Sequence, residues 1–297
     1  MPKVSIVIPT YNQGSLLRLA LESVRAQTET DWEAIVINNY SDDDTVSVIE
    51  SFAEPRFHRI DFRNHGVIAA SRNVGIRTAT ADWVAFLDSD DLWAPDKLAR
   101  CLAAAGDAEA VSHPETIVAD GNLRGVTKTA TPERVTYRSL LFDGNCLSPT
   151  AMMAQRDVLT ELGGFTEDPT LVTAEDFDLW LRMAKRGTRF AFVAAPLAQY
   201  TLHAANSSGS IARHMEASLA VLDRHAATFD NRRPLDGLLH RRARARAIYG
   251  AGRSCQRLGR PGQALGLFGR SLAAYPFSAK PLAAGALALV QLLKDRI

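Results

Sequence analysis

Predicted strands alternate with helical patterns along the first 90 residues, and this alternation restricts the fold more than any other feature of the sequence. The strands are predicted at residues 4–9, 33–38, 57–62 and 83–88. Helical patterns separate them at residues 16–25, 45–52 and 67–79. Because nearly continuous apolar strands must be covered on both faces, the alternation predicts βαβ units. We therefore expect a doubly wound α/β fold with a mixed, mostly parallel sheet.

The pattern changes in the second half of the chain. Shorter strands are predicted at residues 110–120, 189–194 and 197–203, and helices at residues 157–162 and 173–187. Thr173 is a candidate N-cap, and Gly163, Gly164 and Gly187 can end helices in the left-handed conformation. Every later pattern is helical, so we divide the chain into an α/β domain, residues 1–205, and a C-terminal helical region, residues 206–297.

Composition excludes several classes of protein. At 297 residues and 46% hydrophobic, the chain can bury a large core. Cys101, Cys146 and Cys255 are far apart and form no CxxC pair, which argues against a disulfide framework or a zinc site. The apolar run before Pro9 is too short for a signal peptide, and Leu282–Leu293 is too short to span a membrane. We expect a cytoplasmic protein.

The net charge of +1 conceals an uneven distribution. Residues 231–297 carry a net +11, which leaves −10 on residues 1–230. Such asymmetry favours an anionic partner for the basic region. An anionic membrane surface at the inner face of the membrane is one candidate, and self-association or docking on the acidic part is the alternative. We expect no nucleic acid partner, because the sequence has no recognition motif.

Polar residues follow three of the predicted strands directly. They are PTYN (9–12), NNYSDDD (38–44) and DSDD (88–91). In an open parallel sheet, ligands bind beyond the carboxyl ends of the strands. The three carboxylates of Asp88, Asp90 and Asp91 repel one another there, which predicts a positive charge beside them.

The motifs occur in an order that resembles the inverting family 2 glycosyltransferases of GT-A fold, over roughly residues 3–205. The motifs are VSIVIPTYN (4–12), GVIAASRNVGI (66–76), WVAFLDSDDLW (83–93), GGF (163–165) and TAEDFDLW (173–180). The resemblance implies a hexosyltransferase-type enzyme (EC 2.4) with a catalytic domain at residues 1–205. It would move a sugar from a nucleotide-diphosphate donor, a UDP- or dTDP-sugar, to a hydroxyl of a glycan or lipid-linked acceptor in cell-surface polysaccharide synthesis.

The resemblance also implies a metal site with a DXD motif. Asp90 would ligate Mn²⁺ or Mg²⁺ directly, and His203 would lie near the metal and the diphosphate. Hard cations prefer oxygen ligands and neutralise the charge of a departing diphosphate. Asp88 would hold the ribose or the water shell of the metal, and Asp91 would cap the following helix. A solvated turn is the alternative for these acids, and a structural role is the alternative for the histidine.

By the same resemblance, Asp176 is the catalytic base, and Glu175 and Asp178 support it. A carboxylate can take the proton of the acceptor hydroxyl if partial burial raises its pKa toward neutrality. The alternative is that acids in a first helical turn only complement the helix dipole.

Eight residues are assigned to donor binding. They are Pro9, Thr10, Tyr11, Asn12, Asn39, Arg72, Asp88 and Ser89. Tyr11 would stack on the base, and Arg72 would reach the diphosphate, with a surface salt bridge as its alternative. Family members carry acids where this chain has Asn38-Asn39, so Asn39 would accept the base N–H without charge assistance.

Two other classes of protein remain as alternatives. A nucleotidyltransferase predicts a glycine-rich, basic loop after the first strand, whereas PTYNQGS has one Gly and no Lys or Arg. A non-catalytic sugar-nucleotide-binding module would need no base, yet Asp176 is present.

Overall fold

The computed structural model describes residues 1–128, 130–202, 210–228 and 233–294. The chain forms two compact units. The N-terminal unit comprises residues 1–137, 146–169 and 175–206, and the C-terminal unit comprises residues 138–145, 170–174 and 207–297.

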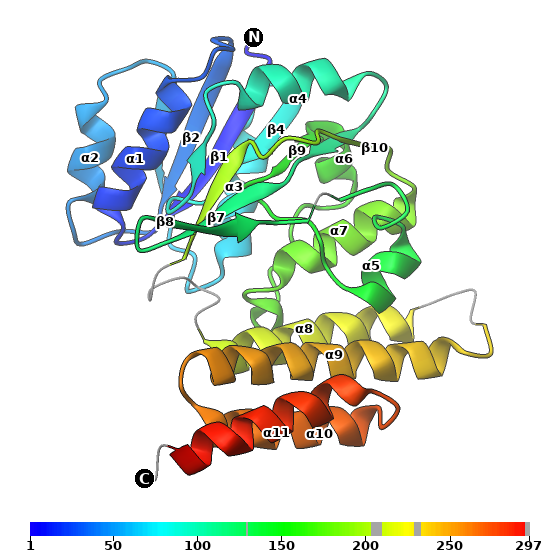
Figure 1. Cartoon of the computed structure of the whole chain (residues 1–297). Coiled ribbons are helices and arrows are strands. Elements are labelled where there is room, and N and C mark those ends of the chain that lie inside the picture. The colour runs from blue at the N-terminus through cyan, green and yellow to red at the C-terminus, as the bar shows by residue number, and fades with distance from the viewer. Residues whose placement is uncertain (129, 203–209, 229–232, 295–297) are drawn as a thin grey trace. The chain divides into compact units, whose positions relative to one another are not determined.

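A seven-stranded sheet is the centre of the N-terminal unit (Figure 1), with strand order β10-β6-β9-β4-β1-β2-β3. The strands are β1 Val4–Thr10, β2 Trp32–Asn38, β3 Phe57–Asp61, β4 Trp83–Phe86, β6 Ala110–Ser112, β9 Met152–Gln155 and β10 Phe190–Phe192. All pairs are parallel except those that β9 makes with β4 and β6. The predicted doubly wound, mostly parallel α/β fold is confirmed.

Helices cover both faces of this sheet. They are α1 Gly14–Arg25, α2 Thr45–Ser51, α3 Ile68–Thr78, α4 Lys97–Ala105, α6 Arg156–Glu161 and α7 Glu175–Arg186. On one face, Ile6 and Ile8 of β1 lie in a buried cluster with residues of α1, α2 and α4. On the other face, a Cβ on Gly75 of α3 would lie 2.3 Å from a methyl group of Val7, so α3 approaches β1 closely. Apolar residues on both sides of β1 explain its unbroken hydrophobic run.

A second, four-stranded sheet has the order β5-β11-β7-β8. Its strands are β5 Leu92–Trp93, β7 Glu115–Ala119, β8 Asn122–Val126 and β11 Ala198–Leu202. The shorter strands predicted within residues 110–120 are β6 and β7, which belong to different sheets. Pro114 lies between them, and proline lacks the N–H that a continuous ladder needs.

The predicted helix ends agree with the structure in part. Gly163, Gly164 and Gly187 all have positive φ, as predicted for helix ends. The last helix of the N-terminal unit, α7, begins at Glu175. Thr173, the predicted N-cap, has a φ of 83° and lies two residues before that helix.

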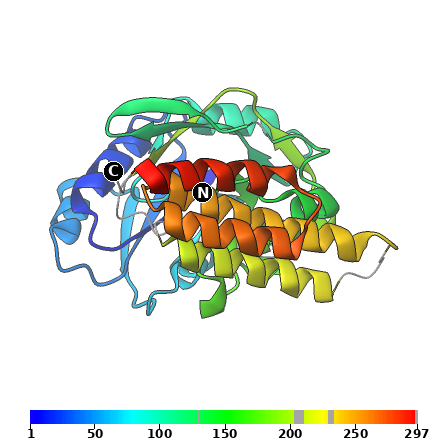
Figure 2. The same ribbon diagram turned by 60° about the horizontal axis from the view of Figure 1, so that its bottom comes forward.

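The C-terminal unit is helical (Figure 2). Its helices are α8 Ile211–Ala227, α9 Asp236–Arg257, α10 Pro261–Ala274 and α11 Ala279–Lys294, together with most of α5 Tyr137–Asp143 and of the 3-10 turn Pro169–Leu171. Helix α9 packs against α8 and α10, and α11 packs along α10. Among the residues that the structure describes, none of the helices has both the length and the apolar content required to cross a bilayer.

Candidate active site

The carboxyl ends of β1, β2 and β4 lie at the same edge of the large sheet. Thr10 at the end of β1 is in register with Asn38 at the end of β2. The ladder from β1 to β4 continues past β4, since Leu87 donates its N–H to the Val7 carbonyl at 3.1 Å. Asp88 therefore emerges beside the polar loops that follow the two neighbouring strands.

Arg72 joins this edge to the start of α7. Its Nη2 donates to Oδ1 of Asp88 at 2.7 Å, and its Nη1 donates to Oε1 of Glu175 at 2.6 Å. The Arg72 side chain is 3% exposed, so its guanidinium is buried and the alternative of a surface salt bridge is wrong. Burial alone would lower the pKa of Arg72, but the charges of Asp88 and Glu175 raise it. The guanidinium is thus a permanent cation between two acidic motifs that lie 87 residues apart in the sequence.

Asp176 follows Glu175 and remains partly accessible. Burial and the charge of Glu175 raise the pKa of its carboxyl to about 7, against the opposing charge of Arg72. A carboxylate with a pKa near neutrality combines a useful ionised fraction with enough basicity to take a proton. The structure therefore supplies the property that a general base needs at this position.

Asp178 lies in the same helical turn but has a different environment. It is buried, accepts the Thr166 hydroxyl at 2.6 Å and pairs with Nε of Arg182 at 2.8 Å. Arg182 also donates to the Gly164 carbonyl at 2.7 Å. These bonds hold the segment after α6 against α7, so Asp178 stabilises α7 through a hydrogen bond and an ion pair.

The GGF segment is also bonded to α3. Oδ1 of Asn73 accepts the Phe165 N–H, and Nδ2 of Asn73 donates to the Phe165 carbonyl, both at 2.8 Å. A Cβ on Gly164 would lie 2.3 Å from Oδ1 of Asn73, and its φ is +71°. Only glycine fits this close approach and this backbone conformation. The two hydrogen bonds of Asn73 thus hold α3 against the GGF segment at the position next to Arg72.

Asp91 does not cap the following helix, and that prediction was wrong. The helix α4 begins at Lys97, with Asp96 at its N-cap position. Asp91 is buried and accepts the Thr150 hydroxyl at 2.6 Å and the Thr201 N–H at 2.9 Å. Burial, followed by the charges of Asp88 and Asp90, raises the pKa of Asp91 well above its usual value. Strand β5 follows directly and places Asp91 inside the protein.

Glu115, which the sequence analysis missed, adds another carboxylate. It begins β7, is buried, and accepts the Ser148 hydroxyl at 2.9 Å. Burial, with the charge of Asp88, raises its pKa to about 7. No motif surrounds it in the sequence, and its proximity to the edge depends on the pairing of β7 with β11. The negative potential at this edge is therefore stronger than the DSDD motif alone indicates.

The predicted donor-binding residues of the first loop differ in their surroundings. Pro9 is buried in β1, and the exposed Tyr11 follows the strand. Asn12 exchanges two hydrogen bonds with Asp42, at 2.5 and 3.0 Å, which tie the loop after β1 to the loop after β2. The buried Oγ1 of Thr10 has no hydrogen-bond partner within the described part of the chain. A buried hydroxyl without a partner is costly, and a bound ligand would satisfy it.

The loop after β2 is also organised by asparagines. Asn38 donates to Asp61 at 2.7 Å, and Oδ1 of Asn39 accepts the Asn64 N–H at 2.9 Å. An amide oxygen accepts two hydrogen bonds, so Asn39 retains capacity for a base N–H. The buried Ser89 donates its hydroxyl to Gln13, the residue before α1.

The residues at this edge fit a hard divalent cation. Asp88 and Asp90 are partly accessible carboxylates, and Asp91 and Glu115, whose pKa values are raised first by burial and then by neighbouring carboxylates, lie close to them. Mg²⁺ and Mn²⁺ commonly take one or two carboxylates together with substrate phosphates and water. Within the described ranges no three His, Cys, Asp or Glu side chains form a complete metal site. The predicted ligand His203 lies outside the described residues.

Comparison with known proteins identifies the family of this chain. Residues 5–163 match the family model described as glycosyl transferase family 2. The chain belongs to this family and is a glycosyltransferase. The matched residues include the edge at Asp88 and the Arg72 motif, and they end before Glu175 and Asp176.

Two curated relatives match more than half of the chain. The succinoglycan biosynthesis protein ExoO of Rhizobium meliloti is 30% identical over 267 residues, which cover 82% of this chain and 74% of the relative. The Escherichia coli enzyme WfgD, a UDP-Glc:α-D-GlcNAc-diphosphoundecaprenol β-1,3-glucosyltransferase, is 28% identical and aligns with 61% of this chain and 70% of its own length.

Solved structures share the GT-A fold with this chain. TarS residues 1–349 from S. aureus, in complex with UDP-GlcNAc, superposes with a TM-score of 0.63 at 19% identity, covering 99% of this chain and 88% of that one. The mannosyltransferase PcManGT of Pyrobaculum calidifontis, in complex with GDP-Man and Mn²⁺, gives 0.59 at 22% identity, with coverage of 100% and 88%.

Proposed function

We propose that this glycosyltransferase is a metal-dependent, inverting enzyme that moves a sugar from a nucleotide-diphosphate donor to a hydroxyl group. The observation that carries the proposal is the buried Arg72, which connects Asp88 to Glu175 beside the basic carboxylate Asp176. Arg72 thereby ties Asp88, on the proposed donor side, to the start of the helix that carries the proposed base.

In the proposed reaction, Asp176 accepts the proton of the acceptor hydroxyl while the hydroxyl oxygen attacks the anomeric carbon. The bond from that carbon to the diphosphate oxygen breaks on the opposite face, so the configuration inverts, and the nucleoside diphosphate leaves with the bonding electron pair. Glu175 takes no proton in this step, because its carboxylate is paired with Arg72. Glu175 instead positions Asp176 and raises its pKa.

Asp90, with Asp88, would hold a divalent Mn²⁺ or Mg²⁺ ion. When bound, such an ion supplies charge neutralisation for the departing diphosphate. Asp88 is engaged by Arg72 through Oδ1, so it suits the ribose or the water shell better than direct ligation. The binding of Mn²⁺ by PcManGT supports a divalent ion at this fold.

The donor would occupy the edge formed by the loops after β1 and β2. Thr10 offers a buried hydroxyl without a protein partner in the described residues, Tyr11 an exposed ring for stacking, and Asn39 an acceptor for the base. A UDP- or dTDP-sugar suits this acceptor because both bases carry an imide N–H. The names of WfgD and TarS support a UDP-sugar, whereas PcManGT was captured with GDP-Man.

The acceptor is proposed to be a glycan or a lipid-linked sugar in cell-surface polysaccharide synthesis. The names of ExoO, for succinoglycan, and of WfgD, for a diphosphoundecaprenol acceptor, support this class. We assign catalysis to residues 1–205 and place the protein in the cytoplasm, at the inner face of the membrane.

A donor screen with Asp176→Asn tests the proposal. Wild-type protein with Mn²⁺ should transfer or hydrolyse one UDP- or dTDP-sugar, and chelation should abolish this activity. Asp176→Asn should lower turnover at least about a hundredfold and change donor affinity less than threefold, since a general base contributes about 10²–10⁴-fold and the amide is isosteric. Calorimetry and product analysis by NMR measure both quantities.

Asp107→Asn is the matched control, because Asp107 is an exposed acid of the same unit outside the site. It should retain full activity. Full turnover in Asp176→Asn, or a product with retained anomeric configuration, would refute the inverting mechanism with this base.

A further inference from the structure

Helix α11 of the C-terminal unit buries small side chains and exposes large apolar ones. The face that packs on the unit contains small residues, with Ala284 3% and Ala288 0% exposed. The outer face is apolar along the helix and comprises Leu282, Ala283, Ala286, Leu287, Leu289, Val290 and Leu293. Its four leucines and its valine are 48–59% exposed. A surface helix normally buries its large apolar residues and exposes polar ones, so this outer face is suited to a further partner.

The charged residues of the segment that contains α10 and α11 are all basic, although Arg270 pairs with Glu216 of α8 at 3.4 Å. From Leu258 to Lys294 the sequence contains Arg260, Arg270, Lys280 and Lys294 but no Asp or Glu. Phe277, in the turn before α11, is 77% exposed. A leucine-rich face with an aromatic residue at one end and cations along it has the composition of helices that lie in a membrane interface.

The arginines of α9 contribute less net positive charge to the C-terminal unit than their number suggests. Arg242 pairs with Asp143 at 2.7 Å, and Arg244 pairs with Asp223, so part of the positive charge is neutralised within the C-terminal unit.

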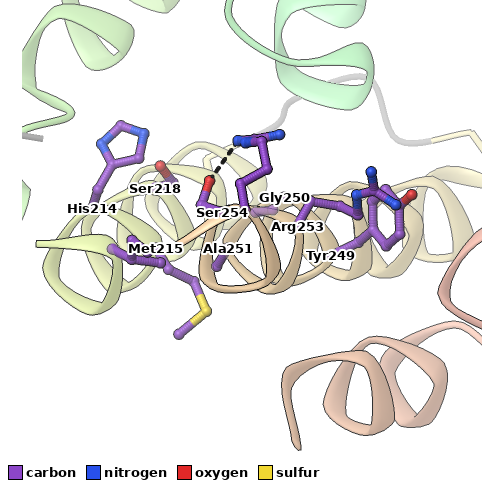
Figure 3. Close-up of a pocket in the computed structure, with 11 residues that line it drawn as sticks. His214, Met215, Ser218, Tyr249, Gly250, Ala251, Arg253 and Ser254 are labelled. Carbon is purple, nitrogen blue, oxygen red and sulfur yellow. Dashed lines mark hydrogen bonds between the residues drawn. The ribbon is translucent and has the colours of Figure 1, made fainter. Parts of the chain in front are cut away.

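Arginines near the C-terminal end of α9 line a pocket, whereas Arg242 and Arg244 in its middle form ion pairs. A pocket of about 720 Å³ lies between α8 and α9 (Figure 3). Arg253, Arg257, Ser218 and Ser254 are among its lining residues, and none of the lining residues is acidic. Arg257 donates to Ser254 at 2.9 Å. Among the residues that the structure describes, the unit therefore combines a pocket lined by arginines and no acids with an apolar face on α11.

We propose that the outer face of α11 docks on the surface of an anionic lipid bilayer, with its leucines at the boundary between headgroups and acyl chains. The helix has 16 residues and a length of about 24 Å, shorter than the roughly 30 Å hydrocarbon core, so it lies in the interface and does not span it. This inference specifies the membrane placement of the proposed function and rests on none of its catalytic assignments.

Charge decides between a bilayer and a second copy of this chain. Two copies that met through α11 would bring together two segments that are cationic and lack acids. Their mutual repulsion opposes such a dimer, whereas anionic headgroups attract each basic residue near the surface.

Vesicle binding by the full chain tests the proposal. Wild-type protein should co-sediment with vesicles of equal phosphatidylglycerol and phosphatidylcholine, and 0.5 M NaCl or pure phosphatidylcholine should weaken binding at least fivefold. Leu287→Gln with Val290→Gln should lower the partition coefficient at least tenfold. Both side chains are about half exposed, so the melting temperature and the donor hydrolysis in solution should not change.

The matched control is Leu19→Gln with Leu123→Gln, which removes two similarly exposed leucines from the N-terminal unit. This variant should bind vesicles as the wild type does. Equal vesicle binding by the α11 variant and the wild type would overturn the proposal. So would a wild-type dimer, seen by light scattering, that the α11 substitutions dissociate, since the occupant would then be a second copy. Neither result depends on whether the donor screen succeeds.

Discussion

The two units depart from ordinary protein surfaces and cores in opposite ways. The N-terminal unit buries charge, in Arg72, Asp91, Glu115 and Glu175. The C-terminal unit exposes large apolar side chains along α11. Folding alone favours neither arrangement, because burial of an isolated charge costs free energy and an exposed leucine contributes no hydrophobic stabilisation. Such departures are expected where a site must bind something outside the chain, which we propose to be a charged donor in one unit and a lipid surface in the other.

The comparison also shows how each departure is tolerated. The buried charges named above have hydrogen-bond partners, for example Arg72 with two carboxylates and Asp91 with a hydroxyl and a backbone N–H. The exposed leucines of α11 need no such partners, since exposure of an apolar side chain breaks no hydrogen bond. Substitutions in the first group should therefore change stability strongly, and substitutions in the second should change binding and leave stability unchanged.

Removal of Arg72 should have the largest effect on stability. Arg72→Met leaves Asp88 and Glu175 as carboxylates without their shared cation, one of them buried. Loss of one partner from a buried ion pair costs about 3–5 kcal/mol. Denaturant unfolding at pH 7 should show a loss of that size, together with loss of sugar transfer.

Arg100→Met is the control for Arg72→Met. Arg100 pairs with Asp96 at 3.5 Å on an exposed helical surface, and exposed pairs contribute about 0–1 kcal/mol. If both variants unfolded at the same denaturant concentration, the buried network would have no special role in this unit.

The next largest expected effect is that of pH on the turnover rate. Asp176 must be ionised to accept a proton, and burial raises its pKa to about 7. With Mn²⁺ saturating, turnover should rise about tenfold per unit from pH 5 to 7 and become level above pH 7. A profile that is flat between pH 5 and 7 would show that the base is a group with a lower pKa.

The elements of the fold were predictable because they depend on local patterns. The strand-length apolar run at β1 and the positive φ at Gly163 and Gly187 follow from residues close together in the chain. The division of residues 110–120 between two sheets was not predictable, since it depends on which distant strands pair with β6 and β7.

The candidate site residues were named from sequence motifs, but the hydrogen-bond network that connects them was not predicted. The motifs identified Arg72, Asp88, Glu175 and Asp176, yet no local pattern shows that one guanidinium bonds residues 88 and 175. Asp91 was misassigned for the same reason, because its partner Thr150 lies 59 residues away in the sequence. Glu115 was missed because a single acid at the start of a strand has no periodic signal.

Lys97 tests whether every buried charge in the N-terminal unit marks function. Its side chain is fully buried on the first turn of α4, its Nζ lies 3.7 Å from the centre of the Trp93 ring, and it has no hydrogen-bond partner in the described residues. Burial lowers its pKa from 10.5 to about 8, with a small opposing contribution from Cys101. Lys97 therefore lacks the carboxylate partners that stabilise Arg72.

Lys97→Met should consequently stabilise the protein, by about 1 kcal/mol at pH 7, where Arg72→Met destabilises it. Burial of the ammonium costs more than 1 kcal/mol, but its contact with the Trp93 ring offsets part of that cost. Below pH 8 the native lysine is charged and the penalty is complete. Between pH 8 and 10.5 the native lysine is neutral while the unfolded one still binds a proton, so the wild type gains stability with rising pH and the advantage of Lys97→Met declines. Thermal unfolding between pH 7 and 10 measures this, with the exposed Lys128→Met as the control. A destabilised Lys97→Met variant would mean that the cation itself holds the loop after β5 in place, and that buried charge in this unit is structural as well as functional.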